Sequence, residues 1–186
     1  GGFYWAGCCV TDKYVIFGKD DGKKNSESSS KIISLDKSTG KAVSSLTVKG
    51  DIRSSVTYSA ETDSYYTSSK AGYIYKFSVD SSGKLGSLKT YTAPGAVTAT
   101  PVVYNGRLYV GCQNGSAGKF IVLDAKTIKE IYTADMQGYP QASMLISTGY
   151  EQTSGKTYIY SPYNAKPAGI TALAPSPAQT SVPQTA

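Results

Sequence analysis

The sequence predicts an all-β protein, and three observations support this fold class. Short apolar runs that end in Leu-Asp or a similar pair recur along the chain, as in KIISLD, YKFSVD, KFIVLD and GITALA. Leu35, Val79 and Leu123 are 44 residues apart, and Leu173 follows after 50. No stretch combines a helical apolar period with capping residues. Repeats of this length, each with several short strands, are typical of a β-propeller.

Four strands are expected in most repeats, because four runs alternate apolar with polar residues and are rich in β-branched and aromatic side chains. In the first repeat these runs are AGCCVTD, YVIFG, KIISLD and KAVSSLTV. Asp-Gly, Asn-Gly and Ser-Gly pairs between runs favour tight turns. The fourth repeat has no clear fourth run.

The chain is therefore expected to form about four antiparallel blades of four strands, either a partial propeller or half of an eight-bladed ring. The expected repeats span residues 4–49, 50–93, 94–136 and 137–174. Residues 175–186 are rich in Pro, Ser, Thr and Gln without an apolar period, which favours a linker or a disordered tail.

The turn between the third and fourth strands carries the most specific motif. An aspartate can accept hydrogen bonds from the N–H groups of such a turn, and a glycine supplies the positive φ that closes it. The residues expected in this structural role are Asp36, Gly40, Asp80, Gly83 and Asp124.

The segment SLDKSTGKAVS resembles the tryptophan-docking repeat of the quinoprotein-like β-propellers. Asp36, Thr39, Gly40 and Lys41 match that motif, and Ser44 stands where the docking tryptophan would be. Tyr132 takes the tryptophan place in the third repeat. The resemblance covers residues 4 to about 174, and it implies a propeller fold in a fragment of a larger propeller.

The resemblance also raises a cofactor question at Cys8 and Cys9. Quinoprotein alcohol dehydrogenases use a disulfide between neighbouring cysteines beside pyrroloquinoline quinone, together with calcium. Consecutive Cα atoms lie about 3.8 Å apart, below the range of about 4.4–6.8 Å usual for disulfides. Neighbouring side chains on a strand also point to opposite faces. We therefore expect three free thiols, with Cys8 and Cys9 as small apolar residues on the two faces of a first strand.

Composition excludes several functions. The chain has no histidine, which removes histidine-dependent catalysis and most zinc sites. Its net charge of +6 comes from scattered lysines rather than an arginine-rich patch, so nucleic acid is not an expected partner. No apolar run is long enough to span a membrane. The acidic residues lie mostly in turns, so neither a metal nor a cofactor is expected, and the sequence favours a non-enzymatic protein.

The segments that join successive repeats are the expected contact surface. In a propeller they approach the central channel, and they contain FYWAG, GDIRSS, PGAVTA and QGYPQA. The hairpin SPYNAKPAG adds a tyrosine at its tip. The residues expected to contact a partner are Tyr4, Trp5, Arg53, Tyr139, Gln141 and Tyr163, since Tyr, Trp and Arg favour contact surfaces.

These observations predict a binding or scaffold module of a bacterial cell-surface or secreted protein, with a protein or a carbohydrate as partner. The alternative is half of a dehydrogenase propeller that depends on pyrroloquinoline quinone and calcium. A half ring would leave two exposed edges. A homodimer that completes an eight-bladed ring would cover them.

Overall fold

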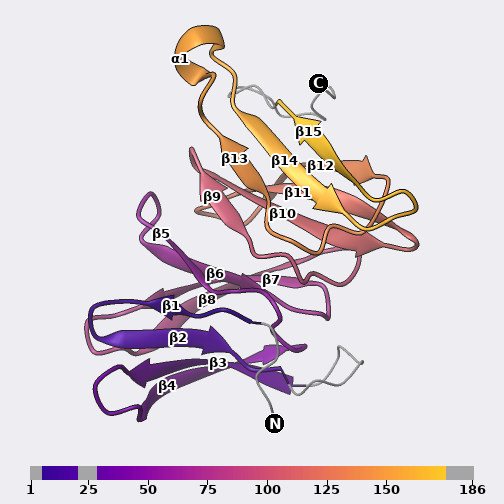
Figure 1. The fold of residues 1–186 in the computed structure, drawn as a ribbon. Coiled ribbons are helices and arrows are strands. Elements are labelled where there is room, and N and C mark those ends of the chain that lie inside the picture. The colour runs from indigo at the N-terminus through magenta and orange to yellow at the C-terminus, as the bar shows by residue number, and fades with distance from the viewer. Residues whose placement is uncertain (1–5, 21–28, 175–186) are drawn as a thin grey trace.

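The computed structural model describes residues 6–20 and 29–174, and within them nearly all regular structure is antiparallel β-sheet. Figure 1 shows the sheets following one another along the chain, with the first at the bottom and the last at the top. In every sheet the order of strands in space is their order in the chain. The expected all-β class is therefore confirmed, and we call the sheets blades 1 to 4.

Each blade is a meander whose last strand lies farthest from its first. Blade 1 contains β1 (Cys9–Val10), β2 (Tyr14–Gly18), β3 (Ser29–Asp36) and β4 (Ala42–Lys49). Blade 2 contains β5 (Thr57–Ser59), β6 (Ser64–Ser68), β7 (Tyr73–Val79) and β8 (Leu85–Thr92). Blade 3 contains β9 (Val102–Tyr104), β10 (Arg107–Asn114), β11 (Ala117–Asp124) and β12 (Glu130–Met136). Blade 4 contains β13 (Leu145–Ser147), β14 (Tyr158–Tyr163) and β15 (Gly169–Leu173).

Blade 4 differs from the other three blades in two ways. It has three strands among the described residues, in line with the missing fourth run of its repeat. A one-turn helix, α1 (Glu151–Ser154), stands between β13 and β14. The helix ends at Gly155, whose φ of 66° lets its N–H bond to the Glu151 carbonyl. A helix of one turn has no apolar period, so sequence periodicity could not reveal it.

The core consists of three apolar clusters, one between each pair of neighbouring blades. Blades 1 and 2 bury Ile16, Ile32, Val48, Ile52, Val56, Tyr65, Tyr75, Phe77 and Leu85. Blades 2 and 3 bury Tyr66, Ile74, Ala93, Val97, Ala99, Leu108, Val110, Cys112, Ile121, Leu123, Ala125 and Ile128. Blades 3 and 4 bury Tyr109, Phe120, Val122, Tyr132, Ala134, Met136, Met144, Ile159 and Leu173.

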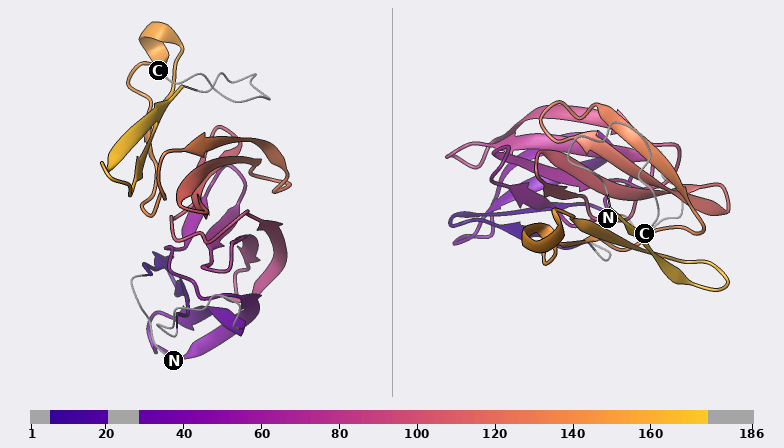
Figure 2. Two further views of the ribbon diagram at one scale, coloured as in Figure 1. Left: turned by 90° about the vertical axis from the view of Figure 1, so that its right-hand side faces the viewer. Right: turned by 90° about the horizontal axis from the view of Figure 1, so that it is seen from above.

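The inner blades are buried on both faces, whereas the outer blades are buried on one. All five residues of β6 are buried, although β6 reads Ser-Tyr-Tyr-Thr-Ser. In blade 1, β3 instead alternates, with Ser30, Ile32 and Ser34 buried and their neighbours exposed or half-buried. Figure 2 shows the reason, because blades 1 and 4 lie at opposite ends of the array.

Polar residues of the inner strands are accommodated by hydrogen bonds between blades. The Ser54 and Thr67 hydroxyls lie 2.8 Å apart, and the Ser68 N–H donates to the Ser54 hydroxyl at 2.8 Å. The Ser68 hydroxyl donates to the Ala99 carbonyl at 2.9 Å, and that of Tyr66 to the Ala125 carbonyl at 2.7 Å. These bonds tie blade 2 to both neighbouring segments, since a buried polar group is costly unless it is paired.

Candidate binding site

The five turn residues lie where the repeat motif places them. The Asp36 carboxylate accepts the N–H groups of Ser38 and Thr39 at 3.0 and 2.8 Å. Two residues of its turn also donate hydroxyl bonds to it. These bonds, from Ser38 first and then Thr39, lower the pKa of Asp36 to about 2. Gly40 follows with φ of 68° and closes the turn.

The same turn recurs in blades 2 and 3. Asp80 accepts the N–H groups of Ser82 and Lys84, and Gly83 has φ of 80°. Asp124 accepts the N–H groups of Lys126 and Thr127 at 3.1 and 2.7 Å. The side-chain bonds to Ser82 and Thr127 lower the pKa of the respective aspartates.

Blade 3 closes its turn with Ile128, which has φ of 62° where blade 1 has Gly40. That backbone is unfavourable for a β-branched residue. Ile128 is only 6% exposed and belongs to the cluster between blades 2 and 3, so burial of its side chain offsets the strain. The aspartates and glycines of these turns thus shape the blades.

Arg53 lies in the segment between blades 1 and 2. Its Nε is 2.5 Å from the Asp20 carboxylate, which is fully buried. The pair joins the end of blade 1 to the connecting segment, because Asp20 lies beyond β2. A buried carboxylate needs a cationic partner, so the main role of Arg53 in this pair is structural.

Three other expected contact residues meet at one bridge between blades 3 and 4. Tyr139 and Asn164 form an isolated β-bridge with bonds of 3.1 and 2.9 Å. The Asn164 side chain donates to Gln141, and the Tyr163 hydroxyl donates to the Gln137 side chain at 2.7 Å. Tyr163 is the last residue of β14 and pairs with Gly169, so its expected position at the hairpin tip is wrong.

The bridge also connects to the segment between blades 2 and 3. The Tyr139 and Thr98 hydroxyls are 2.8 Å apart, and Tyr139 is largely buried. Burial raises the pKa of Tyr139, and the hydrogen bond with the Thr98 side chain partly opposes this. The contact of Arg53 and Tyr139 with a partner stays a prediction, and Tyr4 and Trp5 lie outside the described residues.

The cysteines are three free thiols in different surroundings. Cys8 precedes β1 and is exposed, so the expectation that both neighbours lie on the first strand is wrong. Cys9 is half-buried against the cluster between blades 1 and 2, and burial raises its pKa. Cys112 is fully buried, and burial raises its pKa to about 11.

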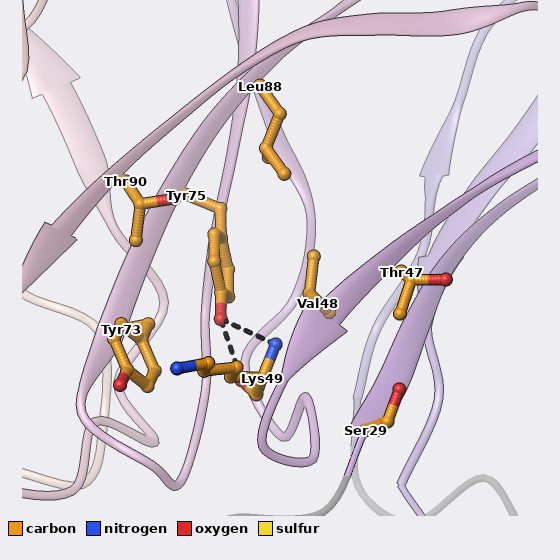
Figure 3. A pocket seen from close by; sticks show the side chains of 8 residues that line it. All are labelled: Ser29, Thr47, Val48, Lys49, Tyr73, Tyr75, Leu88 and Thr90. Carbon is orange, nitrogen blue, oxygen red and sulfur yellow. Dashed lines mark hydrogen bonds between the residues drawn. The ribbon is translucent and has the colours of Figure 1, made fainter.

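A groove lies between the last strands of blades 1 and 2. It encloses about 620 Å³, within the range of small-ligand sites, and Figure 3 shows its walls. β3 and β4 form one wall, and β7 and β8 form the other. Its lining residues are Ser29, Thr47, Val48, Lys49, Tyr73, Tyr75, Leu88 and Thr90.

Two tyrosines on β7 position the groove. Tyr73 and Tyr75 are two residues apart on one face of the strand, and their rings stack with centroids 6.1 Å apart. The Tyr75 hydroxyl donates to the Lys49 carbonyl at 2.7 Å and accepts the Lys49 N–H at 3.0 Å. Burial raises the pKa of Tyr75 to about 12, so this hydroxyl stays protonated and holds the end of β4.

Lys49 and Tyr73 form the chemically distinctive part of the groove. The Lys49 ammonium lies 5.8 Å from the centre of the half-exposed Tyr73 ring, as Figure 3 illustrates. Leu88 is 37% exposed, and Ser29, Thr47 and Thr90 add exposed hydroxyls. The groove thus combines an aromatic surface, hydroxyl groups and one cation. Sequence reasoning did not single out these residues, although the Tyr-Ile-Tyr alternation on β7 was the signal available.

Comparison with known proteins identifies the fold of the chain. No protein-family model and no curated protein sequence matches the chain. Solved structures that match, each at 14% identity, include the computationally designed protein Ika8 and BamB from Moraxella catarrhalis, with TM-scores of 0.59 and 0.56. Both alignments cover 91% of this chain, and 45% and 49% of the other protein.

The third match is the quinohemoprotein alcohol dehydrogenase ADHIIG from Pseudomonas putida HK5, with a TM-score of 0.62 at 14% identity. It covers 90% of this chain and 32% of the dehydrogenase. The chain has a β-propeller fold, similar to the fold of these proteins. It spans about half the length of Ika8 and BamB and a third of the dehydrogenase.

In the propeller, the groove lies at the outer rim, because β4 and β8 are the outermost strands of their blades. The connecting segments with Arg53 and Tyr139 lie elsewhere, so the expected contact residues and the groove are separate features. Among residues 6–20 and 29–174, no three His, Cys, Asp or Glu side chains are grouped to hold a metal ion. The same residues contain no helix that is long and apolar enough to cross a bilayer.

Proposed function

We propose that the chain is a non-enzymatic binding module whose rim groove holds an acidic carbohydrate. The observation that carries this proposal is the pairing of the half-exposed Tyr73 ring with the Lys49 ammonium across two blades. The Tyr75 bonds to the Lys49 main chain hold the end of β4 beside β7, and the Tyr73 ring stacks on that of Tyr75. The main chain and the aromatic surface of the groove are therefore in place before any ligand arrives, which lowers the entropy lost on binding.

The chemistry of the groove matches a sugar with a carboxylate. The C–H face of a sugar ring can pack on the apolar face of Tyr73, beside Leu88. The hydroxyls of Thr47 and Thr90 can both donate and accept bonds with sugar hydroxyls. A carboxylate of the sugar gains a charge-assisted bond from Lys49. A neutral sugar would use the same surface without that bond.

The proposal places the module in a bacterial cell-surface or secreted protein, where it would serve as a scaffold. Its 16 tyrosines and many serines and threonines give the polar, tyrosine-rich composition that favours this location. A protein partner at the connecting segments or hairpins is the competing form of the proposal.

The alternative, half of a quinone-dependent dehydrogenase, is not favoured by the residues. Cys9 packs into the cluster between blades 1 and 2, whereas Cys8 is exposed beside it. Two side chains that diverge in this way do not present a joined pair to a flat cofactor. The aspartates of the repeats are engaged in their turns.

Binding to oligosaccharides of uronic acid units, measured by calorimetry, tests the proposal, with neutral oligosaccharides of equal length as the comparison. Tyr73→Ala removes the stacking surface, and Lys49→Met removes the charge while keeping most of the side chain. Each should weaken binding by about tenfold or more, which corresponds to about 1.4 kcal/mol. Added salt should weaken the wild type more than Lys49→Met.

Tyr58→Ala is the matched control, because Tyr58 is an exposed tyrosine of the same blade outside the groove. It should bind like the wild type. A glycan array without acidic hits would contradict the proposal. So would binding that persists unchanged in Tyr73→Ala, and a protein captured at the connecting segments would then favour the competing form.

A further inference from the structure

Within residues 6–20 and 29–174, each of the two end blades presents an apolar face against which no other blade packs. On blade 1, the face turned away from blade 2 carries Val10, Val15, Ile33 and Leu35, as their strand pairing shows. We call these four residues the first face. Val10 is 58% exposed, and the other three are half-buried.

On blade 4, the face turned away from blade 3 carries Leu145, Tyr158, Tyr160, Ile170 and Ala172. We call these five residues the last face. Leu145 and Ile170 are 65% and 67% exposed, and the Tyr158 and Tyr160 rings stack on the surface. Apolar patches exposed in this way usually mark an interaction surface.

The register of the strands gives every residue of the first face an equivalent in blade 3. Val15 pairs with Leu35 and Val10, as Leu108 pairs with Leu123 and Val103. Ile33 corresponds in the same register to Ile121. All four equivalents are apolar, and they pack against blade 2. The first face therefore has the composition of a face that receives the preceding blade.

The residues of the last face have equivalents in blades 3 and 2, on the face that packs against the following blade. Tyr160 pairs with Ala172 and Pro162 with Ile170, as Tyr109 pairs with Val122 and Gly111 with Phe120. Tyr109, Phe120 and Val122 are at most 3% exposed, because blade 4 covers them. In blade 2 the same four places hold Tyr66, Lys76, Ser68 and Ile74, of which Tyr66 and Ile74 belong to the cluster with blade 3.

We propose that the last face of one chain packs on the first face of a second copy of the same chain, twice, so that two copies close one ring. The occupant is a copy because the chain itself carries both halves of a blade-to-blade interface. Three such interfaces already exist inside it, so the contact continues an established packing.

The proposed contact forms a closed ring of two copies and not an open filament. A contact between two different faces generates either a closed ring or an endless filament, depending on the rotation between copies. A second array packed in the same way continues the rotation from blade to blade, and the ring closes where each array spans half a turn. Figures 1 and 2 show the first and last blades at opposite ends, where each can meet the other copy.

Light scattering coupled to size exclusion measures the predicted state directly. The full chain should elute with twice the 19.6 kDa mass of one copy. Val10→Glu on the first face and Ile170→Lys on the last face should each give monomers, because each places an unpaired charge in both interfaces. Leu145→Lys is a second variant of the last face for use if Ile170→Lys folds poorly.

Mixing the two variants separates loss of contact from loss of folding. In a mixed pair, one interface joins the new glutamate to the new lysine, and the other interface is unchanged. Val10 and Ile170 correspond to Val103 and Ile74, which pack in one cluster between blades 2 and 3. An equimolar mixture should therefore recover dimers that neither variant forms alone.

Tyr58→Lys is the control, because Tyr58 is an exposed residue outside both faces and outside the groove. It should remain dimeric. A monomeric wild type, an open series of larger oligomers, or dimers that survive both charged variants would each overturn the proposal. Binding of carbohydrate in the groove does not enter this test, so the two proposals can fail separately.

Discussion

At the scale of single residues, the turn aspartates show how one side chain fixes a repeat. Asp36 accepts four bonds from Ser38 and Thr39, which satisfies main-chain groups that the tight turn would otherwise leave unpaired. The motif was legible in the sequence because only a short acceptor followed by a residue at positive φ makes this turn. Ile128 was harder to foresee, since its strain is offset by a cluster that only the fold assembles.

Protonation of Asp36 at low pH should reduce the unfolding free energy. Its pKa falls from an ordinary 3.8 to about 2 in the folded chain, chiefly through the Ser38 hydroxyl. A lowered folded-state pKa contributes stability that is present above about pH 4 and is lost as the pH falls toward 2. Asp36→Asn should therefore lose less unfolding free energy than the wild type over this interval, measured by urea unfolding.

Carbon-detected NMR titration checks the cause of the shift. Ser38→Ala should raise the pKa of Asp36 toward its ordinary value, whereas Lys37→Ala, in the same turn, should leave it low. An Asp36 carboxyl that titrates near 3.8 in the wild type would contradict the turn geometry.

At the scale of elements, the position that corresponds to the docking tryptophan of the motif holds different residues in the first and third repeats. Ser44 stands at this place on β4, and its hydroxyl accepts the Leu85 N–H of the next blade at 3.1 Å. Tyr132 stands there on β12, and its buried hydroxyl has no hydrogen-bond partner among the described residues. The resemblance located both positions, but only the packing shows that one contributes a bond and the other contributes apolar area.

Two substitutions at this place should therefore differ in effect. Ser44→Ala leaves a half-buried N–H unpaired and should reduce the unfolding free energy by about 1–3 kcal/mol. Tyr132→Phe removes only an unpaired hydroxyl and should be neutral or stabilising by about 1 kcal/mol. Urea unfolding measures both, with Ser45→Ala, at an exposed neighbour of Ser44, as the control. Equal losses in the two variants would contradict the assignment.

Element positions were easier to predict than the groove they form. Strand runs and turns are local, so the repeat gave blades, order and the weak fourth repeat directly. The groove depends on which residues of β4 and β7 meet across two blades, and no spacing in the chain records that Lys49 approaches Tyr73. Tyr163 was misplaced for a related reason, because the pairing of β14 with β15 continues to Tyr163 and Gly169, and the spacing of the hairpin does not record where that pairing ends.

At the scale of the whole molecule, stability depends on how many neighbours each blade has. In a linear array of repeats, each unit is stabilised by the interfaces on its two sides. Blades 2 and 3 bury both faces, whereas blades 1 and 4 have one interface each within the chain. The open ends are thus the least stable parts of a single copy, and they are also the proposed ring contacts.

Hydrogen exchange tests this link between local stability and assembly. In dilute, monomeric protein, amides of β6, β7, β10 and β11 should exchange more slowly than those of β2, β3 and β14, because the end blades open without unfolding the centre. Raising the concentration until dimers form should slow exchange in β2, β3, β14 and β15 and leave the central strands unchanged, since binding stabilises only the units it covers. The Val10→Glu variant should show no such dependence on concentration. Uniform protection of all four blades at the lowest concentration would contradict the open-end picture, and dimers without slower exchange in β14 would place the contact elsewhere.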